Sequence, residues 1–288
     1  MSKLDEQLAR VYSERRDALS PHGAELLRRS ELNWLHFVGV VCPLSAPPTP
    51  DGDLPKDCLL NAYRERLDHL SMVGQKFGPF VFNRIDLYAA HAAPDSTGNR
   101  PGFYVAHVAY PQIDNVSSPQ VTAWNKLAEK HLAMDGDGDT DDADIDTDYE
   151  IGYASGQLIS VQWTTSDYEH GAAHGTWETN VDNVVLAPNL RSLAASDLFA
   201  KDEAGSLQKI FWSALLAKGW TPPDNQSDAV KAEIGGEVVE PHKWLITKAG
   251  LAVSFSAYEG GCYACNPGTV TAPWTQLKPL LSATAIAP

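Results

Sequence analysis

The chain has 288 residues, of which 43% are hydrophobic and eight are Trp, so it is a globular protein with room for one large or two modest domains. Its 37 acidic and 22 basic residues give a formal net charge of -15. This balance disfavours nucleic acid and anionic membranes as partners, because phosphate binding needs clustered Lys and Arg. A basic partner fits better, and solubility is the plainer alternative. No run of about 18 apolar residues is present, so we expect no membrane-spanning segment.

The first 75 residues are predicted to form a small helical domain. Apolar residues recur there at helical spacing in three stretches, with charged residues between them. These residues are Leu4, Leu8, Val11 and Leu19 in the first stretch, Leu27, Trp34 and Leu35 in the second, and Leu60, Tyr63, Leu67 and Leu70 in the third. Pro21 and the proline-rich stretch from Pro43 to Pro55 separate the three helices, because proline interrupts a helix.

From Phe80 onward the pattern changes to extended runs. Residues 80–88, 103–110 and 158–165 are rich in aromatic and β-branched side chains, which indicates strands. A helix is expected to begin near Ser117, with Pro119 in its first turn. We therefore predict an α+β fold: a helical domain (1–75), then an antiparallel sheet with packed helices (76–288). The second domain comprises a strand-helix unit (76–134), an acidic loop (135–148) and a main sheet (149–288).

The predicted acidic loop has the densest charge in the chain. Asp135, Asp137 and Asp139 match positions one, three and five of an EF-hand calcium loop, and Asp146 falls at position twelve. The fit is incomplete, because Thr140 stands where position six needs glycine and an Asp replaces the usual bidentate Glu. Calcium bound by these residues together with Asp141 is one hypothesis, and a solvated acidic linker is the other. No cofactor is expected to be required.

The four cysteines fall in two close pairs, Cys42 with Cys58 and Cys262 with Cys265. This arrangement is typical of two disulfides formed in an oxidising compartment. Closing the first loop would stabilise the fold by about 3 kcal/mol on the chain-entropy model. The Cys-x-x-Cys pair has redox and zinc-binding alternatives. A turn signal follows it where a redox motif would open a helix, and no second ligand pair has zinc spacing, so a structural disulfide is favoured.

Residues 168–175, Tyr-Glu-His-Gly-Ala-Ala-His-Gly, form the most informative stretch. Read with Asp197-Leu-Phe199 and with residues 258–268, this stretch makes residues 149–281 resemble a known family. That family forms the extracytoplasmic C-terminal domain of the lysozyme-sensing anti-sigma factor RsiV and an accessory region of the peptidoglycan deacetylase PdaC. Its loop usually reads Tyr-x-Gly-Gly-Ala-His-Pro. Here Gly171-Ala-Ala-His174 stands for the core, Gly175 replaces the proline, and the second cysteine pair occupies the late turn.

The loop supplies the candidate partner-binding residues. Tyr168, Glu169 and His170 are expected to be exposed, because loop tips carry binding residues more often than buried strands do. His174 is a further contact candidate, with a hydrogen-bonded structural role as its alternative. Trp163 and Trp177 are candidate anchors, since interface energy concentrates in buried aromatic residues. The sheet core is the alternative for each of these two tryptophans.

A second resemblance covers residues 4–70. A Trp34-Leu35 helix end leads to Cys42, and Cys58 opens an Arg-rich helix that continues to Leu67. This pattern resembles the small LprI-type helical domain, a lysozyme-inhibitor family. The resemblance implies a helical fold and a lysozyme-related role, but no defined functional residues.

No phosphate loop, nucleophile elbow, zinc helix or dinucleotide fingerprint is present in the sequence, and Glu169 and Glu178 are glycosidase candidates only by proximity to the loop. We therefore expect a non-enzymatic protein that binds and inhibits a lysozyme-like muramidase, either as an envelope inhibitor or as an immunity protein. The alternative is a peptidoglycan-binding accessory module. The resemblances imply a periplasmic or other extracytoplasmic location, with a signal or lipid-anchor segment expected in the full-length form.

Overall fold

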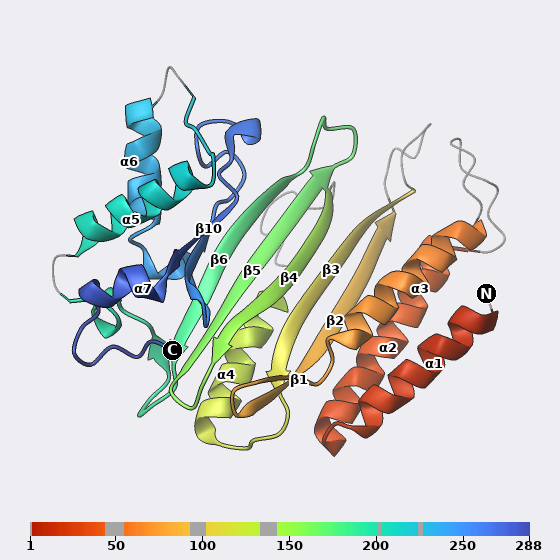
Figure 1. Ribbon diagram of the computed structural model, residues 1–288. Helices are drawn as coiled ribbons and strands as arrows, with labels where there is room; N and C mark the ends of the chain where they lie inside the picture. The colour runs from red at the N-terminus through yellow and green to blue at the C-terminus, as the bar shows by residue number, and fades with distance from the viewer. Residues whose placement is uncertain (1, 44–54, 93–101, 133–142, 201–202, 224–226) are drawn as a thin grey trace. The chain divides into compact units, whose positions relative to one another are not determined.

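The computed structural model describes all of the chain except residues 1, 44–54, 93–101, 133–142, 201–202 and 224–226 (Figure 1). It divides into two compact units. Unit 1 comprises Met1–Asp148 and Ser166–Gly175, and unit 2 comprises Tyr149–Thr165 and Thr176–Pro288. A seven-stranded sheet has the order β1-β2-β3-β4-β5-β6-β7, and a three-stranded sheet has the order β10-β9-β8. Helices together with these sheets confirm the predicted α+β fold.

The elements of the first part of the chain match the predicted order. The helices are α1 (Ser2–Asp17), α2 (Pro21–Val41), α3 (Pro55–Ser71) and α4 (Pro119–Glu129), with the 3-10 turn η1 (Lys130–Leu132) after α4. The strands are β1 (Gln75–Phe77), β2 (Phe80–Ala92), β3 (Phe103–Ile113), β4 (Ala143–Ala154), β5 (Leu158–Glu169), β6 (Thr176–Val185) and β7 (Arg191–Ser192).

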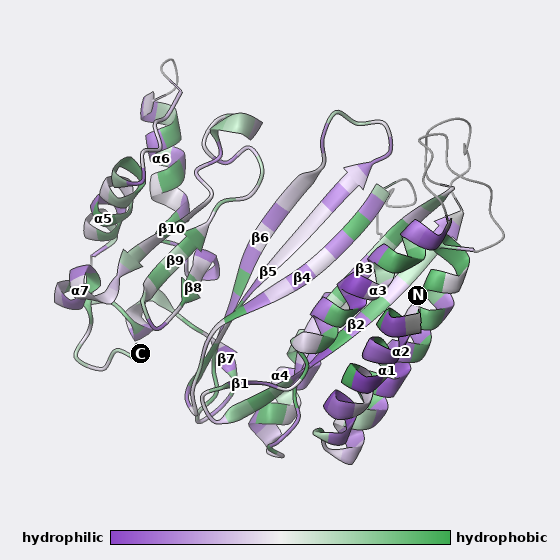
Figure 2. Ribbon diagram, turned by 45° about the vertical axis from the view of Figure 1, so that its right-hand side comes forward, coloured by the Kyte–Doolittle hydropathy of each residue, from purple (hydrophilic) through white to green (hydrophobic). Residues whose placement is uncertain are grey.

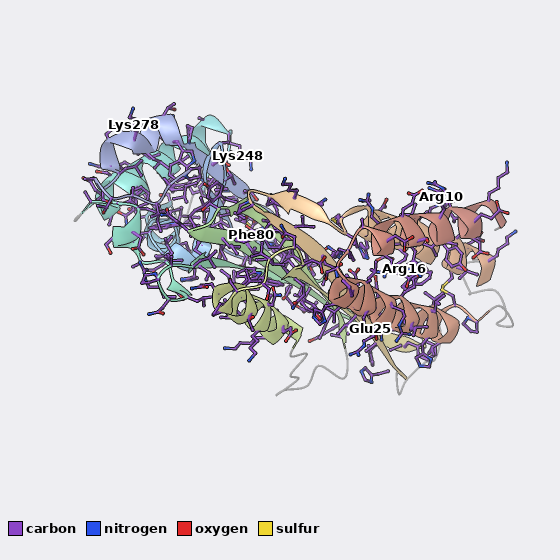
Figure 3. All side chains as sticks on the ribbon, turned by 90° about the horizontal axis from the view of Figure 1, so that it is seen from below. Arg10, Arg16, Glu25, Phe80, Lys248 and Lys278 are labelled. Atoms are coloured by element: carbon purple, nitrogen blue, oxygen red, sulfur yellow. A yellow bond between two sulfur atoms is a disulfide. The ribbon has the colours of Figure 1, made fainter. Side chains whose placement is uncertain are left out.

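Helices α1 to α3 form as their apolar spacing predicts. The side chain of Ser20 caps α2 by accepting a hydrogen bond from the Gly23 N–H at 3.1 Å, and Pro21 occupies the first helical turn. The apolar faces meet in one core cluster that includes Leu8, Leu27, Trp34, Leu70 and Tyr88. Charged residues between these positions lie at the surface, among them Arg10, Arg16 and Glu25 (Figure 3).

Helix α2 runs along the edge of β2. Ser30 Oγ donates to the Asp86 carbonyl at 2.8 Å, and Asn33 bonds both the N–H and the carbonyl of Tyr88 at 2.7 and 2.9 Å. These side chains satisfy edge groups of β2, which would otherwise invite pairing with another strand. The boundary expected at residue 75 is therefore not a division of the structure, because the helices and the first strands share one compact unit.

Helices α3 and α4 cover opposite faces of the β2–β3 pair. Asp86 contacts Arg66 of α3, whereas Gln112 contacts Asn125 of α4. Asp86 pairs with Ala109 in the register, so Asp86 and Gln112 point to opposite faces. Strands β3 and β4 are parallel over Ala106–Val108, and α4 lies between them in the chain, as a parallel connection requires.

Unit 2 carries its own apolar core. Its helices are α5 (Ala204–Ala217), α6 (Ser227–Glu237) and the short α7 (Trp274–Leu277), and its small sheet is β8 (Trp244–Ile246), β9 (Gly250–Ser254) and β10 (Thr269–Pro273). The 3-10 turns are η3 (Ala195–Asp197), η4 (Pro241–Lys243), η5 (Tyr263–Cys265) and η6 (Lys278–Leu280). Fully buried Phe211, Leu215, Trp244 and Val253 belong to one cluster. The Asp197-Leu-Phe199 element contributes Leu198 and Phe199 to the same core.

Both predicted disulfides are confirmed. Cys42 is bonded to Cys58, and Cys262 is bonded to Cys265. With their sulfur atoms joined, Cys262 and Cys265 form the disulfide that the sequence favoured. Among the residues that the structure describes, no helix is both long and apolar enough to cross a membrane.

Candidate functional site

The acidic stretch before Tyr149 is partly a strand. The structure places Ala143–Asp148 in β4, so the prediction that these residues belong to a loop is wrong. The reason is a period of two: Asp144, Asp146 and Asp148 alternate with Ile145 and Thr147, and hydrophilic and hydrophobic residues form bands along β4 (Figure 2). The three aspartates therefore share one face of the strand. Their side chains are 29%, 58% and 36% exposed in chain order.

Behind these aspartates lies a group of charged side chains that we call the ionic cluster, consisting of Arg66, His69, Arg84, Asp86 and His107. Asp86 is fully buried and stands at its centre. Its Oδ2 accepts from Arg66 Nη1 at 2.8 Å, and its Oδ1 accepts from Arg84 Nε at 2.7 Å and from His107 Nε2 at 3.1 Å. Both arginines are fully buried too, so the carboxylate offsets charges that would be costly without a partner.

The ionic cluster holds two of the β4 aspartates in place. His107 Nδ1 donates to Asp146 Oδ1 at 2.6 Å. Arg84 donates to both carboxylate oxygens of Asp148, with Nη1 at 2.6 Å and Nη2 at 3.0 Å. Such charge-assisted and bidentate hydrogen bonds fix the orientation of a carboxylate. Buried cations thus position carboxylates that reach the surface.

The pKa values follow from these contacts. Burial alone would raise the pKa of Asp86, but the hydrogen bond from His107 and the charges of Arg84 and Arg66 outweigh burial and hold it well below its usual range. Burial alone would lower the pKa of His107, but its hydrogen bonds to Asp146 and Asp86 raise it to about 9. His107 is therefore a cation at neutral pH and donates from both ring nitrogens.

His69 is the neutral member of the ionic cluster. Burial lowers its pKa to about 4, and the charges of Arg84 and His107 act in the same direction. Its ring stacks on that of His107, with centroids 5.0 Å apart. Burial also raises the pKa of Tyr88, whose hydroxyl lies 2.9 Å from His69 Nδ1. The Tyr88 hydroxyl and His69 Nδ1 are hydrogen-bond partners, and the His69 tautomer decides which of them donates.

This arrangement favours a structural clamp over chemistry at the cluster itself. His69, Asp86 and His107 offer three ligand atoms within 4.8 Å of one another. However, Asp86 Oδ1 already accepts from Arg84 and His107, so a metal ion there would meet two donated protons and a guanidinium charge. His107 has no free nitrogen to act as a base. What the cluster presents at the surface is the pair of carboxylates on β4, Asp146 and Asp148, that it holds in place.

The β5–β6 turn contributes the predicted contact residues. Tyr168 is 39% exposed, and Glu169 and His174 are exposed as well. His174 Nδ1 lies 3.0 Å from the Gly175 carbonyl oxygen. This local hydrogen bond is of the kind expected if His174 has a structural role. Gly175 replaces the family's proline where a Cβ would approach the Asp167 carbonyl oxygen within 2.5 Å. Contact of this turn with a partner stays a prediction.

His170 departs from the expectation of exposure. Its side chain is only 2% exposed, and its Nε2 lies 2.9 Å from Asp144 Oδ2 on β4. The ring packs against Tyr104 at a centroid distance of 4.5 Å and lies 6.1 Å from the Tyr168 ring. The prediction was wrong because two other strands pack against His170: β4 supplies the Asp144 carboxylate and β3 supplies the Tyr104 ring. His170 thereby joins the β5–β6 turn to the acidic face of β4.

The two candidate tryptophan anchors lie in unit 2. Trp163 is buried, and its Nε1 donates to Asp182 at 3.1 Å, so it forms the sheet core rather than a surface anchor. Trp177 is half-buried, donates to the Phe255 carbonyl at 3.0 Å and meets the Tyr263 ring edge to face. For Trp163 the core alternative is the one observed, and Trp177 is held largely by its own unit.

The calcium hypothesis falls mostly on residues that the structure does not describe. Asp135, Asp137, Asp139 and Asp141 lie outside the described residues. Asp146 is described, and it lies in a strand, where its carboxylate binds His107. Position twelve of an EF-hand opens a helix, so Asp146 does not occupy the position that the motif requires. Calcium binding by the other four residues stays a hypothesis.

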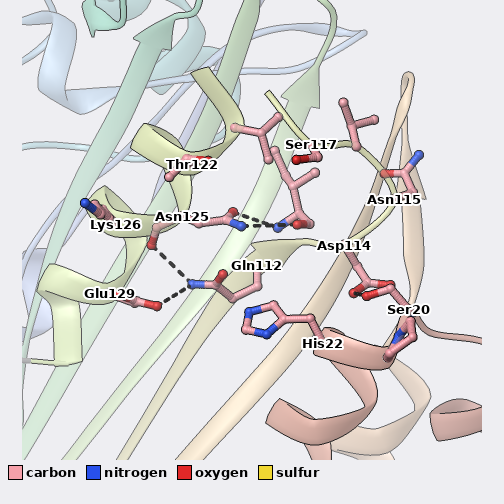
Figure 4. Close-up of a pocket in the computed structure, with 14 residues that line it drawn as sticks. Ser20, His22, Gln112, Asp114, Asn115, Ser117, Thr122, Asn125, Lys126 and Glu129 are labelled. Atoms are coloured by element: carbon pink, nitrogen blue, oxygen red, sulfur yellow. Dashed lines mark hydrogen bonds between the residues drawn. The ribbon is translucent and has the colours of Figure 1, made fainter. Parts of the chain in front are cut away.

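Unit 1 also contains a groove of about 680 Å³ where α2 begins beside α4 (Figure 4). Several of its polar groups bond to one another. Asp114 accepts from the N–H of Ser20 at 2.7 Å and from its hydroxyl, and Gln112 donates to the Asn125 carbonyl and to Glu129, both at 3.2 Å. Among the described residues that line it, none is Trp, Tyr or Phe. These internal bonds join α2 and α4 to β3.

No pattern in the sequence predicted the ionic cluster. Arg66, Arg84 and His107 come from three separate elements, and no spacing in the sequence brings them together. One local signal was present, because Arg84 and Asp86 alternate with apolar residues and therefore share a strand face. Two charges on a buried strand require partners from elsewhere.

Comparison with known proteins supplies no function. No protein-family model matches the chain, and no curated protein matches it. Among solved structures, the chain is similar to a DUF3298 family member from Bacteroides fragilis, with 16% identity, a TM-score of 0.49 and coverage of 73% of this chain and 96% of that chain. It is also similar to a DUF3298 family protein from Pseudomonas aeruginosa, with 14% identity, a TM-score of 0.45 and coverage of 70% and 95%.

Proposed function

We propose that the protein is a non-enzymatic component of the bacterial envelope that binds and inhibits a lysozyme-like peptidoglycan hydrolase. One observation carries the proposal: in unit 1, His170 joins Asp144 of the acidic β4 face to the turn that carries the exposed Tyr168 and Glu169, in a chain of net charge -15. We call this the acidic surface, defined by Asp144, Asp146, Asp148, Tyr168 and Glu169. The two disulfides fit an oxidising compartment, which is where such a hydrolase acts.

The physics of the acidic surface suits a basic partner. A negative potential attracts a cationic enzyme over about 8 Å at physiological salt and raises the association rate. Asp146 and Asp148 are already held by His107 and Arg84, so little side-chain entropy is lost when a partner docks. Tyr168 adds an aromatic ring of the kind that concentrates interface energy. Inhibition would follow if these side chains cover the substrate cleft.

A turbidity assay tests the proposal. Peptidoglycan suspensions are lysed by a panel of lysozymes, and the protein is added at increasing ratios. We expect inhibition of at least one basic lysozyme to be complete near one equivalent. Glu169→Gln should weaken inhibition, whereas Glu6→Gln, which makes the same charge change at an exposed position on α1, should have less effect. Full lysis at every ratio with every lysozyme would overturn the proposal, as would lysis by the protein alone.

A further inference from the structure

A groove between α5 and α6 in unit 2 has the features of a ligand site. Its volume is about 530 Å³, within the range of small-molecule sites. Helix α5 contributes Gln208, Lys209 and Trp212 to its lining, and α6 contributes Asp228 and Lys231. None of these residues belongs to the acidic surface, so the groove requires an explanation of its own.

Trp212 provides a flat apolar wall in this groove. It is half-buried, and its ring meets that of Trp220 edge to face, with centroids 5.9 Å apart and an interplanar angle of 89°. Trp220 in turn donates from Nε1 to the Cys265 carbonyl at 2.6 Å. The Trp212 indole is therefore held in one orientation while part of it still lines the groove. An indole presented in this way can stack on the face of a ring-shaped ligand.

The groove is cationic, unlike the chain as a whole. Lys209 and Lys231 are exposed, and Asp228 is the single carboxylate among the described residues of the lining. In the part of the chain that the structure describes, neither lysine forms an ion pair. Lys231 Nζ instead lies 5.3 Å from the Trp212 ring centroid, a cation-π contact worth about 0.5–1 kcal/mol at an exposed site. Such a weakly held ammonium group is available to an anionic ligand.

Polar groups of the groove can accept and donate hydrogen bonds. Gln208 Nε2 donates to the Gly235 carbonyl at 2.9 Å, which orients the amide across the groove. A Cβ on Gly235 would meet this amide at 3.3 Å, so glycine allows the close approach of α6. The hydroxyl of Ser213 lies in the same lining. An aromatic wall combined with amide, hydroxyl and ammonium groups matches the two faces of a sugar, one apolar and one rich in hydroxyls.

We propose that this groove binds an acidic saccharide. A pyranose ring packs on Trp212, and the carboxylate of the ligand pairs with Lys231 and Lys209. The flexible Lys231 side chain then leaves the indole face to meet the carboxylate. Peptidoglycan glycan without its stem peptides offers this chemistry through the free lactyl carboxylate of its muramic acid residues, and a uronic acid polymer offers it through its ring carboxylates. The inference goes beyond hydrolase inhibition, because it assigns a second ligand to unit 2.

Calorimetric titration with three tetrasaccharides tests the inference. The probes are the alternating N-acetylglucosamine–N-acetylmuramic acid tetrasaccharide, tetragalacturonate and chitotetraose, which lacks carboxylates. We expect at least one acidic probe to bind about tenfold or more tightly than chitotetraose, and the tighter acidic probe identifies the source. Equal binding of chitotetraose would overturn the recognition of a carboxylate. Absence of binding by all three up to about 5 mM would overturn the site.

Matched variants locate the binding in the groove. Lys231→Ala should weaken binding of the acidic probe about tenfold, whereas Lys248→Ala, at an exposed lysine outside the groove lining, should leave it unchanged (Figure 3). Trp212→Ala should abolish binding, and the indole N–H resonance of Trp212 in the unmodified protein should shift on titration. Equal effects of the two lysine variants, or an unmoved Trp212 resonance, would contradict the assignment. Lysozyme inhibition should be unchanged in Lys231→Ala, which separates the two proposals.

Discussion

The two units bury a helix against a strand by different physical means. In unit 1, α3 meets β2 through the fully buried Arg66 and Asp86, 2.8 Å apart, in addition to the apolar cluster that contains Leu70 and Tyr88. In unit 2, α5 packs Phe211 and Leu215 into an apolar cluster. Apolar burial stabilises without regard to direction, whereas a buried ion pair requires one geometry. The ionic cluster therefore fixes the orientation of two carboxylates at the surface, those of Asp146 and Asp148.

The largest effect is expected when the ionic cluster loses its central charge. Asp86→Asn keeps the shape of the side chain but leaves Arg66, Arg84 and His107 without their shared anion. We expect the free energy of unfolding of unit 1 to fall by about 3–5 kcal/mol. Urea unfolding followed by hydrogen exchange of α3 and β2 measures it. Glu14→Gln, which removes an exposed ion pair with Arg10, should cost less than about 1 kcal/mol. Equal losses in both variants would contradict the role of the cluster.

The apolar core of unit 2 provides the matching test. Leu215→Ala should cost about 2–5 kcal/mol, because it removes a fully buried side chain and leaves a cavity. This loss should be the same at pH 5, 7 and 9, since Leu215 carries no titratable group. Hydrogen exchange of α5 and β9 reports it. A loss that varied with pH would contradict the contrast between apolar burial in unit 2 and buried ion pairs in unit 1.

The ionic cluster should make stability depend on pH. The pKa of His107 is about 9 in the fold and 6.5 as its ordinary value, so its contribution is complete below pH 6.5 and is lost as pH rises through 9. The loss is about 3 kcal/mol, at about 1.4 kcal/mol for each unit of pH. His69, with a pKa of about 4, contributes above pH 6.5 and loses that contribution as pH falls through 4.

Unfolding free energies measured from pH 4 to 9.5 should therefore peak near pH 6.5. The groups that act on the two histidines are Asp86, Asp146, Asp148, Arg84, Glu65 and Tyr88. His107→Gln should flatten the alkaline side of the curve and leave the acid side in place. An alkaline side unchanged by this substitution would place the titration elsewhere.

Smaller effects, on binding rates, are expected at the acidic surface. Tyr168→Ala should weaken binding of an inhibited lysozyme by about 1–2 kcal/mol, through a faster dissociation rate. Asp146→Asn should mainly slow association, and more so at low salt, because it removes a negative charge that attracts the partner. Surface plasmon resonance separates the two rates. Unchanged rates in both variants would move the contact away from this surface.

In the first part of the chain, the sequence predicted the elements that a local pattern determines. Proline positions and leucine spacing located α1 to α3, and Ser117 with Pro119 marked the start of α4, whose cap is Ser118. The aspartates of β4 were assigned to a loop because their charge density outweighed their alternation with Ile145 and Thr147. A high density of charge indicates only that residues prefer water, whereas alternation with a period of two indicates a strand and predicts which face each residue occupies. That alternation was the usable signal.

The rest of the site depends on tertiary contacts that no local pattern contains. His170 was expected at an exposed tip, and only the arrival of Asp144 and Tyr104 from neighbouring strands buries it. Ser30 and Asn33 of α2 cover the edge of β2. The role of these two polar side chains depends on where α2 packs, which their own sequence does not indicate. Such contacts follow from strand order and helix placement, which the sequence alone did not determine.

The most direct test of the central claim is the association rate with a basic lysozyme, measured as ionic strength rises. The acidic surface predicts a one-to-one complex whose association rate falls steeply with added salt, together with lysis that stops as the complex forms. A protein that forms no complex with any lysozyme, or one whose association rate is the same at low and high salt, would contradict the claim.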